Sequence, residues 1–220
     1  MKENNEREWF QPRKEEFERL LRDPMMAAVA KVNTALEAKA PEYVTDPQKS
    51  IYRIYRDTRF SPNKTPYKTH LGALLHHRKL GKDSGAVIYF HVSTDAFLIA
   101  FGLYMMPTEL LTHVRAHIAD HHKDLESILR KKQVKELFDT MQGDKLTRPP
   151  KGYPAGHPAI EYLKHKNFLL EASMPAEEAT TANAVSLVQK HVLAAIPFIE
   201  YLNKPLLTAL RKRDPLLTGN

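Results

Sequence analysis

The sequence has 220 residues, of which 42% are hydrophobic and 27% charged, with a formal net charge of +7 and no cysteine. A soluble chain of this length buries roughly 70% of the surface that its unfolded form exposes, which is enough for one hydrophobic core. The lack of cysteine excludes disulfides, zinc sites with cysteine ligands and a cysteine nucleophile. We predict one domain over residues 1–205 and a C-terminal tail over residues 206–220.

The first ten residues, MKENNEREWF, are mostly charged or polar, where a secretory signal needs an apolar run of about 7–15 residues. The longest apolar stretch, residues 96–107, is far shorter than the ~20 residues that a helix needs to cross a membrane. We therefore expect a cytoplasmic protein with no membrane partner.

Two helical patterns open the chain. Asn4 or Asn5 is suited to cap a segment that runs through Phe10, and Pro12 is suited to restart it. Asp23 followed by proline is typical of a second helix start. The apolar residues that then recur at helical spacing are Met25, Val29, Val32 and Leu36.

Alternating apolar residues predict strands in the middle of the chain. Four such segments, at residues 50–56, 69–76, 86–92 and 97–104, are expected to form an antiparallel meander. A tight connection at residues 93–95 joins the third strand to the fourth.

The last hundred residues are mostly helical in pattern. A long helix is predicted from Pro107, with a break, to Gly143. After a short helix started by Pro158, residues 168–173 are expected to form a fifth strand. A final helix over residues 181–203 is predicted to bend at Pro197 and to end at Pro205. The fold class is therefore α+β, a mainly antiparallel sheet of about five strands with helices on one face.

The positive charge is concentrated in one segment. Residues 50–82 hold eight basic residues and one acid, Asp57, which leaves 25 basic and 25 acidic residues in the rest of the chain. A local excess of this kind raises the concentration of anions near it. The sequence therefore predicts a negatively charged partner.

The loop inside this segment carries the candidate site. Pro62 and Pro66 are expected to stiffen it, which lowers the entropy lost when several cations converge on a ligand. Lys151, in a later proline-rich loop, is a candidate to close over it. The predicted ligand-binding residues are Arg56, Asp57, Arg59, Lys64, Tyr67, Lys68, His70 and Lys151. In the alternative interpretation, Arg56, Asp57 and Arg59 form a salt-bridged structural bracket.

The same segment carries a family resemblance. The pattern Arg-x-x-Arg-Asp-x-Arg-Phe-x-x-x-Lys-x-Pro-Tyr-Lys, from Arg53 to Lys68, resembles the signature of a bacterial and fungal family, domain of unknown function 2461. Similar features occur in residues 4–10, in residues 148–152 and at His157, so the resemblance covers nearly the whole chain. It implies a family without implying an activity.

Motifs of the common enzyme classes do not occur: the sequence has no Gly-x-Ser-x-Gly, no phosphate-binding glycine loop and no His-Glu-x-x-His. His113, His117 and His121 recur every four residues, but they border an apolar helical stripe, so we predict no metal site and no cofactor. Proton transfer among Asp57, His70 and His91 would need these residues to meet in space, so catalysis stays an open question.

Three functions compete. The leading hypothesis is a site for a small anionic ligand, such as a phosphorylated metabolite, formed by the basic loop between two strands. The first alternative is nucleic-acid binding, because aromatic residues are interleaved with the basic ones. The second alternative is a structural or interaction domain without a ligand. The sequence does not indicate an oligomeric state.

Overall fold

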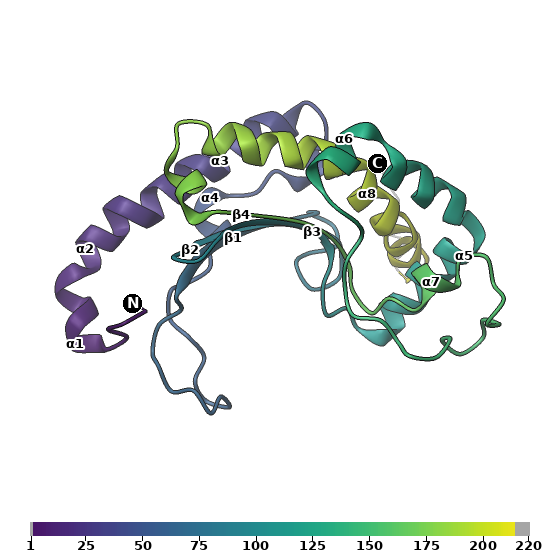
Figure 1. The fold of residues 1–220 in the computed structure, drawn as a ribbon, viewed down its shortest axis with the longest axis horizontal. Coiled ribbons are helices and arrows are strands. Elements are labelled where there is room, and N and C mark those ends of the chain that lie inside the picture. The colour runs from purple at the N-terminus through teal and green to yellow at the C-terminus, as the bar shows by residue number, and fades with distance from the viewer. Residues whose placement is uncertain (1, 214–220) are drawn as a thin grey trace.

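The computed structural model describes residues 2–213 and contains a single antiparallel sheet (Figure 1). The sheet has four strands in the order β1-β2-β3-β4, each paired with its neighbour in the chain. The strands are β1 His70–His76, β2 Val87–Ser93, β3 Phe97–Leu103 and β4 Phe168–Met174. The α+β fold with helices and an antiparallel sheet is confirmed, with four strands in place of about five.

The missing strand is the one predicted at residues 50–56. This segment is extended and lies antiparallel to residues 66–73, but it forms only isolated bridges, Ile51 to Ala73 and Tyr55 to Tyr67. The two bridges are out of register by two residues, so no regular ladder joins them. Beyond the second bridge, Pro66 has no amide hydrogen to donate, so the pairing ends there. The prediction of a regular strand there is wrong, although its position beside β1 is close to the truth.

The N-terminal segment is one nearly continuous helical run, in which α3 lies over the sheet while α1 and α2 extend beyond its edge (Figure 1). Its parts are α1 Arg7–Phe10, η1 Gln11–Arg13, α2 Lys14–Phe17, η2 Glu18–Arg22 and α3 Asp23–Glu37. Helix α3 begins at Asp23, with Pro24 in its first turn, as predicted, but Asp23 does not cap a free helix end, because the π-helical turn η2 leads into it without a break. Two short pieces follow, η3 Pro41–Tyr43 and α4 Pro47–Ser50.

The C-terminal half supplies the remaining helices. They are α5 Thr108–Arg130, α6 Lys132–Leu137, α7 Ile160–Leu163, η4 Ala176–Thr180 and α8 Ala184–Arg213. The backbone of α5 leaves helical geometry at His121, whose carbonyl accepts a 3.1 Å hydrogen bond from the Tyr201 hydroxyl of α8.

Helix α8 continues through Pro205, so the predicted end at that residue is wrong. Leu202 and Leu206 are both buried, and Asn203 accepts a 2.7 Å hydrogen bond from the Ala86 amide. This packing on both sides of Pro205 offsets the hydrogen bond that proline cannot donate. Residues 206–213 of the predicted tail are therefore helical, while residues 214–220 lie outside the described residues.

The two faces of the sheet differ. Helices α3 and α8 lie over one face, which holds alternate apolar side chains of each strand in the core (Figure 1). The opposite face, called the open face from here on, is covered by no helix of residues 2–213 (Figure 1). Among residues 2–213, α8 alone is long and apolar enough to pass a test for membrane spans, and much of that helix is buried in the core of this protein.

Candidate functional site

Strand alternation decides which side chains reach the open face. In β1 and β2, Leu71, Ile88 and Phe90 point into the core, so their neighbours point the other way. The register of the strands brings these neighbours into rows across the sheet. The open-face residues are His70, Gly72, Leu74, His76, Val87, Tyr89, His91, Ser93, Leu98, Ala100, Gly102, Leu169, Glu171 and Ser173.

A hollow of about 470 Å³ lies on this face. Its floor is mostly apolar and comes from all four strands. Tyr52, Lys68 and His70 border it at the β1 side, while Glu171 of β4 and Tyr104 border it at the other. The hollow therefore combines an apolar floor with a few polar groups at its edges, as small-molecule sites commonly do.

Tyrosine and histidine rings are packed together at the β1 side of the hollow. The Tyr89 hydroxyl and His91 Nδ1 are 3.1 Å apart, at hydrogen-bond distance. The His91 ring lies 5.0 Å from the His70 ring, and the Tyr89 ring lies 6.3 Å from that of Tyr52. A Cβ atom on Gly72 would lie 2.9 Å from the Tyr89 hydroxyl oxygen, so glycine leaves room for this ring against the strand.

Burial sets the protonation of this cluster. Burial lowers the pKa of His70 and His91 below 6.5, and the nearby charges of Lys68 and His70 respectively lower it further. Burial also raises the pKa of Tyr89 to about 12. At neutral pH, the cluster therefore presents neutral imidazoles and a protonated phenol, both able to donate hydrogen bonds.

Lys68 is the cation of the open-face hollow. It is half-buried, and its Nζ lies 4.8 Å from the centre of the Tyr52 ring. Within residues 2–213, Lys68 makes no ion pair, and its Nζ donates no hydrogen bond. Burial, then the positive charge of Arg53, lower the pKa of Lys68. The ammonium group thus lies in a partly desolvated place where no neighbouring carboxylate balances it.

Residues 51–56 and 66–73 lie side by side and are joined by residues 57–65; this segment is called the hairpin from here on. Its tip, residues 57–65, is held by its own contacts. Arg59 donates to both carboxylate oxygens of Asp57, from Nε at 3.0 Å and from Nη2 at 2.8 Å. Arg59 thereby lowers the pKa of Asp57 to about 2. The Nζ of Lys64 donates to the Thr58 carbonyl at 2.8 Å. Asp57, Arg59 and Lys64 are all exposed, and each makes its hydrogen bonds to other residues of the tip.

Arg56 and Lys64 border a second hollow, of about 540 Å³, between the hairpin and the N-terminal segment. Glu6 and Glu8 border the same hollow, so acidic and basic groups are mixed there. Arg59 does not line either hollow.

Tyr67 is fully buried, and its chain neighbours Pro66 and Lys68 border the two hollows. The Asn5 side chain bonds both backbone groups of Tyr67, accepting from its amide at 2.9 Å and donating to its carbonyl at 3.0 Å. The ring packs on Phe10 and Tyr55, with centroid distances of 4.4 and 5.4 Å. Its hydroxyl has no hydrogen-bond partner among the described residues. Tyr67 therefore anchors the hairpin to the first helix.

The structure does not bring Lys151 to the basic segment. The loop that carries it joins α6 to α7, on the side of the molecule opposite the hairpin, where Lys151 is exposed (Figure 1).

Of the three residues considered for proton transfer, Asp57, His70 and His91, the structure brings two together. His70 and His91 are in contact, whereas Asp57 pairs with Arg59 on the hairpin tip. Elsewhere, the His117 ring lies 4.7 Å from both His121 and Tyr201. Within the described part of the chain, no three His, Asp or Glu residues are arranged to hold a metal ion.

Sequence reasoning had named Lys68 and His70 but missed Tyr89 and Glu171 as residues of this hollow. The signal for Tyr89 was its place in β2, between the buried Ile88 and Phe90. No local signal indicated Glu171, because its position depends on the pairing of β4 with β3.

Comparison with known proteins gives one match. A family model described as "Conserved hypothetical protein (DUF2461)" matches residues 1–201. No curated protein and no solved structure matches the chain.

Proposed function

The chain belongs to the DUF2461 family of conserved hypothetical proteins, as the sequence pattern predicted, and we propose that its open face binds a small anionic ligand. Lys68 would supply the positive charge, and Tyr52, His70 and Tyr89 would supply hydrogen bonds around it. The proposal moves the site from the hairpin tip to the base of the hairpin, where residues 51–56 lie beside residues 66–73.

The unpaired ammonium group of Lys68 carries this proposal. A buried or half-buried charge is costly unless an opposite charge or hydrogen bonds compensate it. Arg53, whose charge also lowers the pKa of Lys68, has the same sign and adds to that cost. A bound anion would relieve both effects, and its contact with Lys68 would be a strong, charge-assisted hydrogen bond.

The far edge of the hollow limits the ligand further. Glu171 would repel a second negative group there, while it would accept a hydrogen bond from a hydroxyl or an amine. A ligand with a phosphate or carboxylate at one end and such a donor at the other fits this distribution of charge.

A thermal-shift titration tests the proposal. Inorganic phosphate is added at constant ionic strength set with chloride, and a ligand that binds only the folded state raises the unfolding temperature. We expect a rise for the wild-type protein and for Lys64→Ala, whose cation lies on the hairpin tip, but none for Lys68→Ala. No stabilisation by phosphate, or equal stabilisation of Lys68→Ala, would contradict the proposal.

One observation favours nucleic-acid binding as a second candidate function. Phe60 on the hairpin tip is 93% exposed, and the Arg59 guanidinium carbon lies 5.8 Å from the centre of its ring. Exposed aromatic rings beside arginine can stack on unpaired bases. Single-stranded oligonucleotide binding should then weaken steeply with salt and with Phe60→Ala, and binding unaffected by either would exclude this function.

A further inference from the structure

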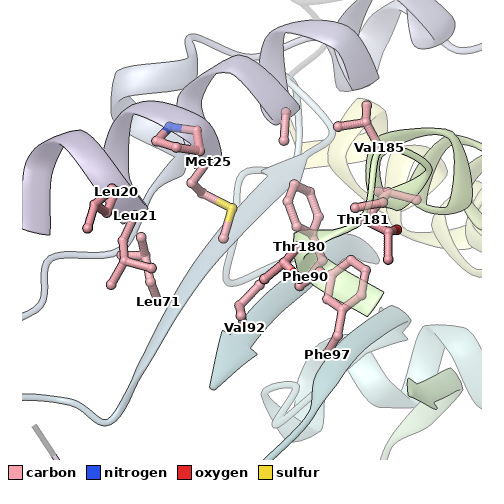
Figure 2. Close-up of a pocket in the computed structure, with 15 residues that line it drawn as sticks. Leu20, Leu21, Met25, Leu71, Phe90, Val92, Phe97, Thr180, Thr181 and Val185 are labelled. Carbon is pink, nitrogen blue, oxygen red and sulfur yellow. The ribbon is translucent and has the colours of Figure 1, made fainter. Parts of the chain in front are cut away.

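A third hollow, here called the helix groove, lies on the helix-covered side of the sheet, away from the proposed anion site (Figure 2). It has a volume of about 240 Å³. The N-terminal helical run forms one wall, and η4 with the start of α8 forms the other. Leu71, Phe90, Val92 and Phe97 of the sheet form the floor.

The lining of the helix groove is almost entirely hydrocarbon. Of its fifteen lining residues, thirteen are apolar, and the other two are Thr180 and Thr181. The Thr180 and Thr181 hydroxyls already donate to the carbonyls of Glu177 and Glu178, at 2.8 and 2.9 Å. The walls therefore offer no unused side-chain donor, so whatever the groove holds must itself be apolar.

A local irregularity of the helix borders this groove. The turn Glu18–Arg22 is π-helical, and π-helical turns occur frequently at functional sites. Two leucines of this turn lie at the groove, Leu20 and Leu21, and they are 50% and 47% exposed. An occupant that covers them would remove apolar surface from water, which is favourable.

The small size of the groove favours a single hydrocarbon chain over a protein as its occupant. A stable protein interface needs about 800 Å² from each partner, and Leu20 and Leu21 are the only large exposed apolar side chains that line the groove among the described residues. A cavity of about 150 Å³ lined by Leu, Ile and Phe takes up benzene, so 240 Å³ has room for a somewhat longer chain.

We propose that the helix groove binds the hydrocarbon chain of an amphiphile, with its polar head in solvent. The two elements that flank the groove carry charges of both signs, Arg19 and Arg22 on the π-helical turn and Glu177 and Glu178 on η4. Because these charges are mixed, and because Arg22 already pairs with Glu18 at 3.1 Å, we expect the groove to show no preference for one charge of head group. Selection rests on the length of the chain.

Calorimetric titration with dissolved 1-alkanols, from hexanol to dodecanol, measures this selection without a charged head. Each added methylene buried in the groove should strengthen binding about fourfold, until the groove is full and the affinity stops rising. Leu20→Glu at the mouth and Ala28→Phe in the wall should each weaken decanol binding about tenfold or more. Leu193→Glu is the matched control, because Leu193 is 42% exposed on α8 and does not line the groove.

Both leucines are exposed, so neither replacement disturbs the core, and a loss of binding in Leu20→Glu alone does not reflect unfolding. A plateau in chain length that is lost in Leu20→Glu and kept in Leu193→Glu would establish the site. Absence of binding, an affinity that rises without a plateau, or equal losses in Leu20→Glu and Leu193→Glu would overturn the proposal. Binding seen only with alkanol aggregates or phosphatidylcholine vesicles would overturn it as well.

Discussion

The tip and the base of the hairpin use the same kinds of residues in opposite ways. At the tip, Arg59 has the Asp57 carboxylate and Lys64 has a backbone carbonyl, so both cations are satisfied inside the loop. At the base, Lys68 has, among residues 2–213, only the face of Tyr52 and the repulsion of Arg53. The comparison teaches that cations close together in the sequence can differ in whether the fold gives them a partner. Our proposal places the site at the cation that the described residues leave without a carboxylate.

Strand geometry explains why the two regions differ. Lys68 and His70 are two residues apart in an extended segment, so their side chains lie on the same side and border one hollow. The tip lies beyond the last bridge, Tyr55 to Tyr67, and the side-chain hydrogen bonds of its residues join them to one another.

Reversing the charge at the base should have the largest effect. Lys68→Glu should weaken phosphate binding about a hundredfold, because a charge-assisted hydrogen bond is lost and repulsion replaces it. Arg59→Glu, with the same change of charge at the tip, should change the affinity less than about threefold, because that site is exposed and screened. Isothermal titration of both variants makes the comparison. Similar losses in the two would show that overall charge, not the base, attracts the anion.

Removing the space beside Tyr89 should have the next largest effect. Gly72→Ala places a Cβ atom 2.9 Å from the Tyr89 hydroxyl oxygen, so the ring must move and its hydrogen bond to the ligand is lost. The loss of one hydrogen bond predicts about a fivefold weaker phosphate affinity. Gly156→Ala is the control, because a Cβ atom there meets nothing within 4 Å. An unchanged affinity in Gly72→Ala would remove Tyr89 from the site.

A change of pH should have a smaller effect on phosphate affinity. This effect distinguishes binding at the base of the hairpin from binding at its tip. A bound anion favours protonated histidine, and the pKa of His70 lies below 6.5 in the free protein. Phosphate affinity should therefore rise about threefold as the pH falls from 8 to 5, once corrected for the protonation of phosphate itself, and His70→Gln should remove this rise. The tip has only arginine, lysine and Asp57, whose pKa is about 2, so a pH-independent affinity would favour the tip.

The smallest effect should follow from breaking the pair at the tip. Exposed ion pairs contribute little to stability. Asp57→Asn should therefore leave both the denaturant midpoint and the phosphate affinity unchanged within measurement error. A clear loss of affinity would show that Asp57 and Arg59 act on the ligand.

Much of the fold was predictable because it depends on local pattern. Alternation gave β1, β2, β3 and β4 to within one or two residues at most ends, since each strand buries one face. Two signals misled. Pro205 does not end α8, because buried Leu202 and Leu206 hold the helix on both sides of it. Alternation in residues 50–56 predicted a regular strand, but this segment forms only isolated bridges.

The site was harder to predict than the fold because its parts come from separate elements. The sequence placed Lys68 and His70 in the right segment, but it could not show that Asp57 would satisfy Arg59 and leave Lys68 unpaired. Glu171 is a hundred residues away and reaches the hollow only through the pairing of β4 with β3. Lys151 was included because its proline-rich loop was a candidate to close over the basic segment, and the fold places that loop elsewhere (Figure 1).

Locating a heavy anion in crystals of the protein tests the central claim most directly. Crystals soaked in tungstate, a phosphate-like anion with strong anomalous scattering, would show where the anion binds. We predict a peak in the open-face hollow, in contact with Lys68 and next to Tyr52. A peak held by Arg56, Arg59 or Lys64 with none at Lys68, or no ordered peak at all, would contradict the account.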